Sequence, residues 1–150
     1  MLNGLTMNDL AEPAKAPDAG ARKECGLDMP LGLLGFENHK KFTLISNPDE
    51  EPFQWLQAAD EPSLTFLIVP TFDVLSEYAP DISEDDVAFL GLKSAEDAVV
   101  YGIVTLHRKG PATINLKGPI VVNRHSLKAK QVVITNATRY SVHHPIVTND

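Results

Sequence analysis

A chain of 150 residues, 43% hydrophobic and 22% charged, has the size and composition of one ordinary globular domain with its own core. Its apolar runs are too short for a membrane-spanning helix, and its N-terminus lacks the basic start and apolar stretch of a secretory signal. The formal net charge of −7 disfavours extensive contact with nucleic acid, because an acidic body repels phosphates. A single cysteine, Cys25, cannot form an internal disulfide, which fits a cytoplasmic protein.

The first 25 residues differ in composition from the rest. The stretch AEPAKAPDAGARKEC, residues 11–25, is rich in Ala and Pro and shows no hydrophobic periodicity. Such composition is typical of a flexible arm. We therefore predict a flexible N-terminal tail over residues 1–25, without a strand, and a folded domain over residues 26–150.

Strand signals recur at short spacing after this tail. Six short segments are rich in β-branched or aromatic residues, and Pro, Gly, Asn or Asp separates most of them. They are residues 41–45, 63–69, 98–106, 112–116, 119–123 and 131–135. The segment PFQWLQ, residues 52–57, fits either a strand or a turn of helix.

One segment has the features of a helix. In DISEDDVAFLGL, Ser83 can cap the N-terminus, three acids follow in the first turn, and Gly91 can end the helix. Val87 and Leu90 would then face inward. Many short strands with one short helix near residues 83–90 predict a mainly β fold, a small antiparallel β-barrel or sandwich.

The charges are unevenly distributed. Residues 71–97 hold eight acids and one base, whereas residues 101–150 hold seven bases and one acid. This asymmetry suggests an acidic face and a basic face. Four of the C-terminal basic side chains (Arg124, His125, Lys128 and Lys130) fall between the apolar runs 119–123 and 131–135, which favours a hairpin with a solvated loop. A nucleic-acid contact is the alternative, although the loop has no aromatic side chain to stack on bases.

The sequence shows no pattern of a catalytic or metal site. His143 and His144 are neighbours in an expected strand, so they point to opposite faces, and no Cys-x-x-Cys or His-Glu-x-x-His spacing occurs. Cys25 falls in the expected tail, where nothing holds a base beside it. No nucleophile elbow, phosphate-binding loop or dinucleotide fingerprint occurs either. We therefore expect no catalytic residue, no metal and no cofactor.

The order of several motifs resembles the FliW family of flagellar assembly factors. The resemblance covers roughly residues 27–147 and depends on four motifs in sequence order. They are G-F-E (residues 35–37), W-L-Q (residues 55–57), N-L-x-x-P-I-V-x-N (residues 115–123) and Q-V-V (residues 131–133). Family members usually carry a strand-like stretch before the G-F-E region, and residues 1–25 show none. The resemblance implies an antiparallel β-barrel-like domain.

The same resemblance implies a protein with two protein partners and no enzymatic activity. One partner is flagellin, and the other is CsrA, the carbon storage regulator, an RNA-binding translational repressor. In the family scheme, export of flagellin frees the assembly factor, which then binds CsrA and relieves the block on flagellin translation.

Two sets of residues are our candidates for these contacts. Acids of the predicted helix would meet the basic RNA-binding surface of the repressor: Glu84, Asp85 and Asp86. Apolar side chains would line a groove for the amphipathic helical ends of flagellin: Phe36, Trp55, Leu56 and Phe72. Core packing is the alternative role for the apolar set. A direct RNA-binding module that uses the basic C-terminal third is the alternative function.

Overall fold

The structure, a computed structural model, describes residues 22–147. These residues form nine strands, one α-helix and four short 3-10 helices. The strands are β1 (Lys23–Asp28), β2 (Lys41–Ser46), β3 (Gln54–Ala58), β4 (Thr65–Pro70), β5 (Ala98–Thr105), β6 (Thr113–Ile114), β7 (Ile120–Asn123), β8 (Ala129–Gln131) and β9 (His144–Pro145). The helices are α2 (Glu84–Leu90) and the 3-10 turns η3 (Pro48–Glu50), η4 (Thr71–Asp73), η5 (Ala95–Asp97) and η6 (Ala137–Arg139).

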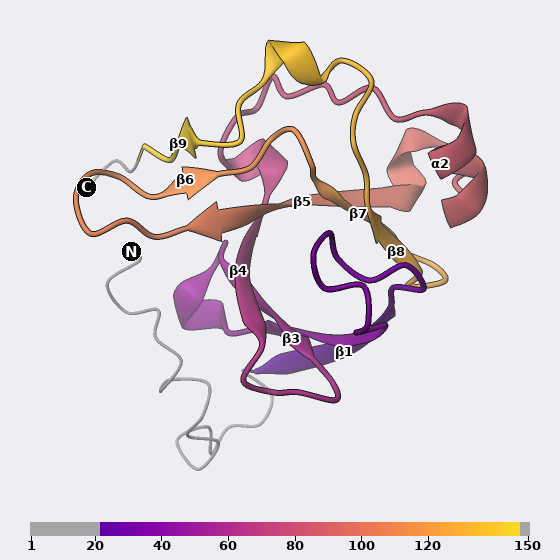
Figure 1. The fold of residues 1–150 in the computed structure, drawn as a ribbon, viewed down its shortest axis with the longest axis horizontal. Helices are drawn as coiled ribbons and strands as arrows, with labels where there is room; N and C mark the ends of the chain where they lie inside the picture. The colour runs from indigo at the N-terminus through magenta and orange to yellow at the C-terminus, as the bar shows by residue number, and fades with distance from the viewer. Residues whose placement is uncertain (1–21, 148–150) are drawn as a thin grey trace.

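All named strand pairs are antiparallel. Strands β1 to β5 pair in sequence order, β5 also pairs with β7, and β7 pairs with β8. Strands β6 and β9 extend the sheet from the far end of β5. Figure 1 shows that strands β1 to β5, β7 and β8 curve into a ring. A single parallel bridge between Asp28 and Lys128 joins its two edge strands, so the ring is barrel-like but not closed by a continuous ladder.

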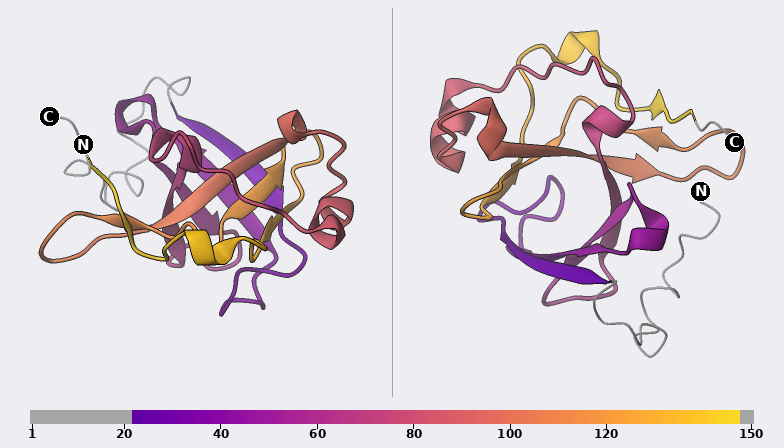
Figure 2. Two further views of the ribbon diagram at one scale, coloured as in Figure 1. Left: turned by 90° about the horizontal axis from the view of Figure 1, so that it is seen from above. Right: turned by 180° about the vertical axis from the view of Figure 1, so that it is seen from behind.

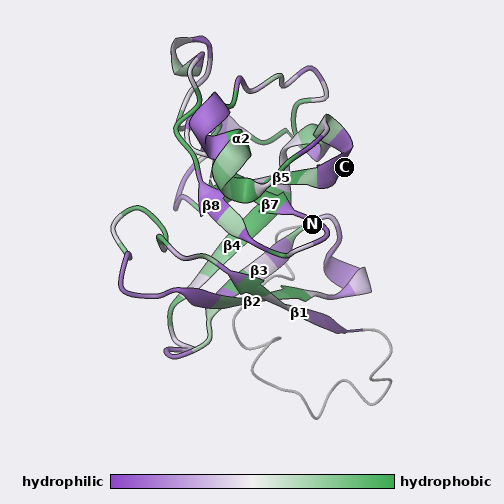
Figure 3. Ribbon diagram, turned by 90° about the vertical axis from the view of Figure 1, so that its right-hand side faces the viewer, coloured by the Kyte–Doolittle hydropathy of each residue, from purple (hydrophilic) through white to green (hydrophobic). Residues whose placement is uncertain are grey.

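The alternation of side chains along the strands builds a core on each face of this sheet. One cluster takes side chains from every strand of the ring, including Leu56 of β3 and Ile120 of β7, and fills its interior. The other cluster lies on the outer face, where Trp55 of β3 and Val121 of β7 pack against residues from 74–92 and 132–146. Figure 3 shows the resulting hydrophobic strands at the centre of the domain.

The helix begins and ends where its sequence predicts. The Ser83 hydroxyl oxygen accepts a hydrogen bond from the Asp86 backbone N–H at 3.2 Å, and Gly91 adopts a left-handed φ of 69°. The Leu92 N–H then reaches the Val87 carbonyl at 3.0 Å, which satisfies a carbonyl of the last turn. The mainly antiparallel β fold with one short helix is thus confirmed.

The structure corrects three boundaries. Strand β1 starts at Lys23, so residues 23–25 belong to the sheet and not to a tail, and Cys25 is paired opposite Leu44. The rest of the predicted tail, residues 1–21, lies outside the described residues. The ambiguous segment 52–57 overlaps strand β3, residues 54–58, and is therefore mostly strand. The second strand of the hairpin covers residues 129–131 and not 131–135.

Residues 22–147 contain no helix with the length and hydropathy of a membrane-spanning segment.

Candidate protein-interaction surface

The acidic helix and the basic loop pack against each other. The Lys130 ammonium group of β8 donates a hydrogen bond to the Asp86 carboxylate of α2, and both side chains are largely buried. The Lys128 ammonium lies 4.0 Å from the centre of the Phe89 ring, and that of Lys130 lies 5.6 Å from it. Such cation–π contacts favour a charged nitrogen over an aromatic face. Lys128 and Lys130, two of the four basic residues of the predicted hairpin loop, therefore contact the helix.

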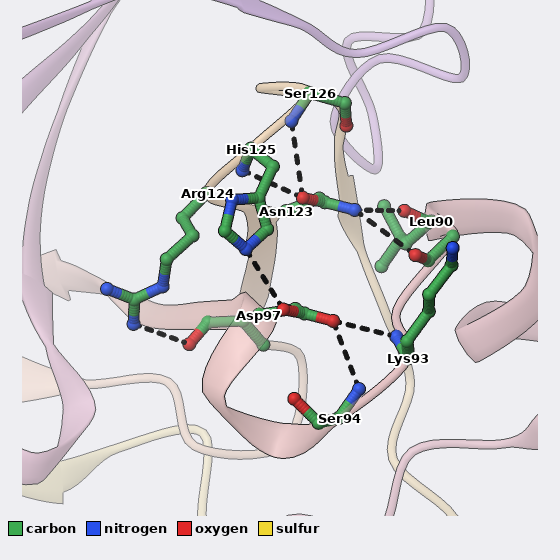
Figure 4. A network of polar contacts seen from close by, with 10 residues as sticks. Leu90, Lys93, Ser94, Asp97, Asn123, Arg124, His125 and Ser126 are labelled. Atoms are coloured by element: carbon green, nitrogen blue, oxygen red, sulfur yellow. Dashed lines mark hydrogen bonds and ion pairs between the residues drawn. The ribbon is translucent and has the colours of Figure 1, made fainter.

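A buried asparagine joins this loop to the end of the helix. The Asn123 amide nitrogen donates to the Leu90 carbonyl at 2.8 Å and to the Gly91 carbonyl at 3.4 Å. Its amide oxygen accepts the N–H groups of His125 at 2.8 Å and Ser126 at 3.2 Å (Figure 4). One side chain thus satisfies the last carbonyls of α2 and shapes the turn after β7.

Asp97 makes a second connection between the same two segments. Its carboxylate accepts the N–H groups of Lys93 at 2.9 Å and Ser94 at 3.0 Å, and its other oxygen lies 3.0 Å from Nε2 of His125 (Figure 4). These backbone hydrogen bonds, with a smaller contribution from His125, lower the pKa of the Asp97 carboxyl. The Arg124 N–H also donates to the Asp97 carbonyl at 2.8 Å.

The expectation of separate acidic and basic faces is therefore wrong around this loop. Strand β7 and the helix-to-β5 connection lie next to each other, because Ala98 pairs with Asn123 at the start of β5. Acids and bases that are far apart in the sequence are brought together by this pairing. The loop of the hairpin ends before Lys130, which belongs to strand β8. The Lys130 side chain reaches Asp86 of the helix.

The three predicted acidic contacts fall into two groups. Glu84 and Asp85 are exposed in the first turn of α2, where the positive end of the helix dipole favours them. Asp86 is only 7% exposed and is paired with Lys130. Glu84 and Asp85 are thus free to meet a partner, whereas Asp86 stabilises the domain.

The four predicted apolar contacts do not line one groove. Trp55 and Leu56 are buried on opposite faces of β3, and the Trp55 indole N–H donates to the Glu50 carboxylate at 3.3 Å. Adjacent residues of a strand must point to opposite faces, so the two cannot share an open surface. Phe36, in the loop after β1, is 39% exposed, and Phe72, in η4, is 59% exposed. These two aromatic side chains remain available on separate elements.

The histidines do not gather into a cation site in residues 22–147. No group of three or more His, Cys, Asp or Glu side chains there is placed to hold a metal ion. His107 contacts the Thr113 hydroxyl at 2.9 Å, and its ring centre lies 6.1 Å from that of His143. His144 lies in β9, opposite Ile114.

Comparison with known proteins decides the family. A model of the FliW protein family matches residues 18–146. The chain belongs to the FliW family. Its FliW relatives include the flagellar assembly factor FliW of Leptospira interrogans, serogroup Icterohaemorrhagiae, serovar copenhageni, which is 38% identical over 112 residues, 73% of this chain and 75% of the relative. FliW of Borreliella burgdorferi strain ZS7, also described as a flagellar assembly factor, is 37% identical over 126 residues, 83% of this chain and 95% of the relative.

A solved FliW structure has the same fold. The crystal structure of the flagellar assembly factor FliW matches this chain with a TM-score of 0.73 and 31% sequence identity. The match covers 82% of this chain and 86% of that chain. The FliW resemblance inferred from the motif order is thus confirmed by sequence and by structure.

Two exposed apolar side chains beside Phe36 are additional to the predicted set. Leu31 is 49% exposed and Leu34 is 57% exposed, and both lie in the β1–β2 loop with Phe36. The sequence signal is the apolar stretch LGLLGF, residues 31–36, whose two glycines mark a turn and not a strand. Leucines inside a turn sequence indicate either an anchor in the core or an exposed contact.

Proposed function

We propose that this chain is a flagellar assembly factor that binds two proteins, the translational repressor CsrA and flagellin. The observation that carries the proposal is the family match over residues 18–146, together with relatives described as flagellar assembly factors. While flagellin is bound, this protein does not bind the repressor. Export of flagellin leaves this protein free to bind CsrA. Both partners place the protein in the cytoplasm, and no step requires a catalytic group or a cofactor.

Exposed carboxylates on α2 support the repressor contact. Glu84 and Asp85 project from the first turn of the helix, in a chain with a net charge of −7. A basic RNA-binding protein is attracted to such a surface, and the same charge repels its RNA. The attraction acts over about 8 Å at physiological salt. Asp86 contributes indirectly, because its pairing with Lys130 fixes the helix on the sheet.

Exposed aromatic side chains support the flagellin contact. Phe36 and Phe72 keep 39% and 59% of their surface exposed, whereas Trp55 and Leu56 serve the core. Aromatic side chains are enriched at protein–protein interfaces. Phe36 and Phe72 are therefore the two members of the predicted apolar set that we assign to a partner.

Calorimetry and gel filtration with purified CsrA and purified flagellin test the proposal. We expect a complex with each protein, and we expect the double change Glu84→Gln with Asp85→Asn to weaken CsrA binding several-fold with little effect on flagellin. The matched control is Asp49→Asn with Glu51→Gln, which removes the same two charges from exposed positions in and beside η3. No complex with either protein at tens of micromolar would refute the proposal.

Direct RNA binding by the basic C-terminal third has less support. Lys130 is paired with Asp86, His125 with Asp97, and Lys128 lies over Phe89. Three basic side chains of this segment therefore already have partners within the chain. A gel-shift assay with labelled RNA distinguishes direct RNA binding from protein binding. Direct RNA binding predicts a shift that weakens steeply as the salt concentration is raised.

A further inference from the structure

The seven lysines and arginines of the C-terminal third fall into two groups. Arg124, Lys128 and Lys130 lie in the hairpin beside α2, where their side chains contact other parts of the chain. The other four side chains make no hydrogen bond or ion pair within residues 22–147, and we call them the basic stripe: Arg108, Lys109, Lys117 and Arg139. Residues 101–147 contain no Asp or Glu. No acid from this part of the sequence therefore neutralises the stripe.

Two neighbouring segments carry the basic stripe. Strand β6 pairs with β9, so the β5–β6 hairpin and the C-terminal segment run side by side. The Ile146 N–H donates to the Ala112 carbonyl at 2.8 Å at one end of this contact, and the Leu116 N–H donates to the Ser141 carbonyl at 3.0 Å at the other end. Figures 1 and 2 show the hairpin and β9 together, extending from the ring on the side opposite α2. Side chains of both segments thus belong to one surface.

A pair of basic residues lies at each end of this surface. Arg108 and Lys109 are exposed at the tip of the β5–β6 hairpin. Lys117 and Arg139 lie at the other end, since each is within two residues of the second of these hydrogen bonds. The two hydrogen bonds are four residues apart, which corresponds to about 13 Å of extended chain. With the hairpin tip beyond them, the two basic pairs are separated by roughly 15–20 Å.

The surroundings of the stripe favour an acidic polypeptide over other anions. No Phe, Tyr or Trp occurs between Tyr101 and Tyr140, and the Tyr140 ring packs edge-on against Tyr78, so RNA bases find no aromatic platform there. Segments that bind anionic membranes carry about four to eight lysines or arginines in one cluster, whereas the stripe has two separate pairs. The net charge of −7 also repels a long polyanion or a charged membrane more than it repels a segment with a few carboxylates.

We propose that the basic stripe is a docking surface for an extended acidic segment of a partner protein, with a pair of carboxylates facing each basic pair. Charge complementarity carries the assignment, because the four unpaired cations form a linear array with no acid beside them in sequence. An extended segment spans roughly 15–20 Å with about five residues between the centres of its two acidic pairs. The inference goes beyond the proposed function, since the stripe contains none of the residues assigned to CsrA or flagellin and lies away from α2.

The test measures the fluorescence anisotropy of a peptide that carries an uncharged dye and two pairs of glutamates separated by three uncharged residues. Binding is measured at about 50 mM salt, where screening of charges is weak. One variant removes the pair at the tip, Arg108→Gln with Lys109→Gln. A second variant removes the other pair, Lys117→Gln with Arg139→Gln. Melting temperatures confirm that each variant folds.

The matched control is Lys23→Gln with Lys93→Gln. Both lysines are exposed, one in β1 and the other shortly after α2, and both lie outside the stripe. The control and the two test variants lose the same number of positive charges, so a difference in affinity between them reports the position of the charges and not the net charge.

We expect the wild-type protein to bind the peptide, each test variant to bind it at least about threefold more weakly, and the control to change the affinity by less than about 1.5-fold. A peptide with its four glutamates in one run should bind more weakly than the spaced peptide. Any of four results would overturn the proposal: no binding of the spaced peptide, equal loss in the control, equal affinity for the clustered peptide, or stripe-dependent self-association or binding of an RNA oligonucleotide or anionic vesicles in its place. Binding of whole CsrA and flagellin is measured separately, so failure here leaves the proposed function standing.

Discussion

Removing the Asn123 side chain is expected to destabilise the domain strongly. Asn123 is 6% exposed and makes four hydrogen bonds, two of them at 2.8 Å. A net contribution of about 0.5–1.5 kcal/mol for each of the two short bonds, with less for the two longer ones, gives about 3 kcal/mol for Asn123→Ala. The change leaves the Leu90 carbonyl at the end of α2 without its side-chain partner, and it frees the turn that carries His125.

Urea unfolding followed by circular dichroism measures this effect as a fall in the free energy of unfolding at an unchanged m-value. The companion variant Asn123→Asp keeps the acceptor for the loop but places a carboxylate against the carbonyls of Leu90 and Gly91, at the negative end of the helix dipole. It is therefore also destabilised at neutral pH, and it recovers part of the loss in acid when the carboxyl is protonated. The exposed neighbour His125→Gln is the control, with an expected change below about 0.5 kcal/mol. A loss of less than about 1 kcal/mol in Asn123→Ala would refute the role assigned to this residue.

Three further outcomes are expected. Gly32→Ala should lower the free energy of unfolding by about 1–3 kcal/mol, because φ at Gly32 is 65° and the new Cβ would lie 2.7 Å from backbone atoms. The control is Gly26→Ala, whose Cβ would enter open space and should change the free energy of unfolding by less than about 0.5 kcal/mol. The pKa of Asp97 is lowered in the folded protein, so its charge stabilises the fold above the ordinary carboxyl pKa, and this stabilisation is lost as the pH falls through the pKa of the folded state. The urea midpoint of Asp97→Asn should therefore drop less than that of the wild type between about pH 6 and about pH 3. Tyr78→Phe removes the 2.6 Å bond from the buried hydroxyl to the Leu116 carbonyl and should cost about 1 kcal/mol. An unchanged thermal midpoint would contradict a stabilising role for this hydrogen bond.

The sequence predicted the elements whose local signals agree with the fold. The helix at residues 84–90 carries its cap, its acidic first turn and its terminal glycine, and the long strand β5 is rich in β-branched residues. Strand β1, KECGLD, has a weak strand signal because it combines three charged residues and a glycine at the edge of the sheet, and charged residues are typical of protected edges. Strand β8 was placed too late because the apolar run 131–135 looks more strand-like than Ala129–Gln131.

The candidate contacts depended on long-range pairing that no local pattern contains. The bases at 124–130 looked solvated, yet the pairing of β5 with β7 brings that loop to the end of α2 and places Lys130 beside Asp86. Trp55 and Leu56 are apolar candidates for one groove in the sequence, but neighbouring residues of a strand with two covered faces enter different cores. Exposure of Leu31 and Leu34 follows from how Leu33 enters the ring, which is a property of the folded loop.

The most direct test of the account is a competition assay with CsrA bound to a labelled target RNA. The chain alone should leave the RNA unshifted, it should release RNA from CsrA when added at micromolar concentration, and purified flagellin should restore the CsrA–RNA complex. Two results would contradict the claim that this protein controls translation only by binding other proteins. One is a shift of RNA by the chain itself, and the other is a CsrA–RNA complex that is unchanged by the folded chain at tens of micromolar.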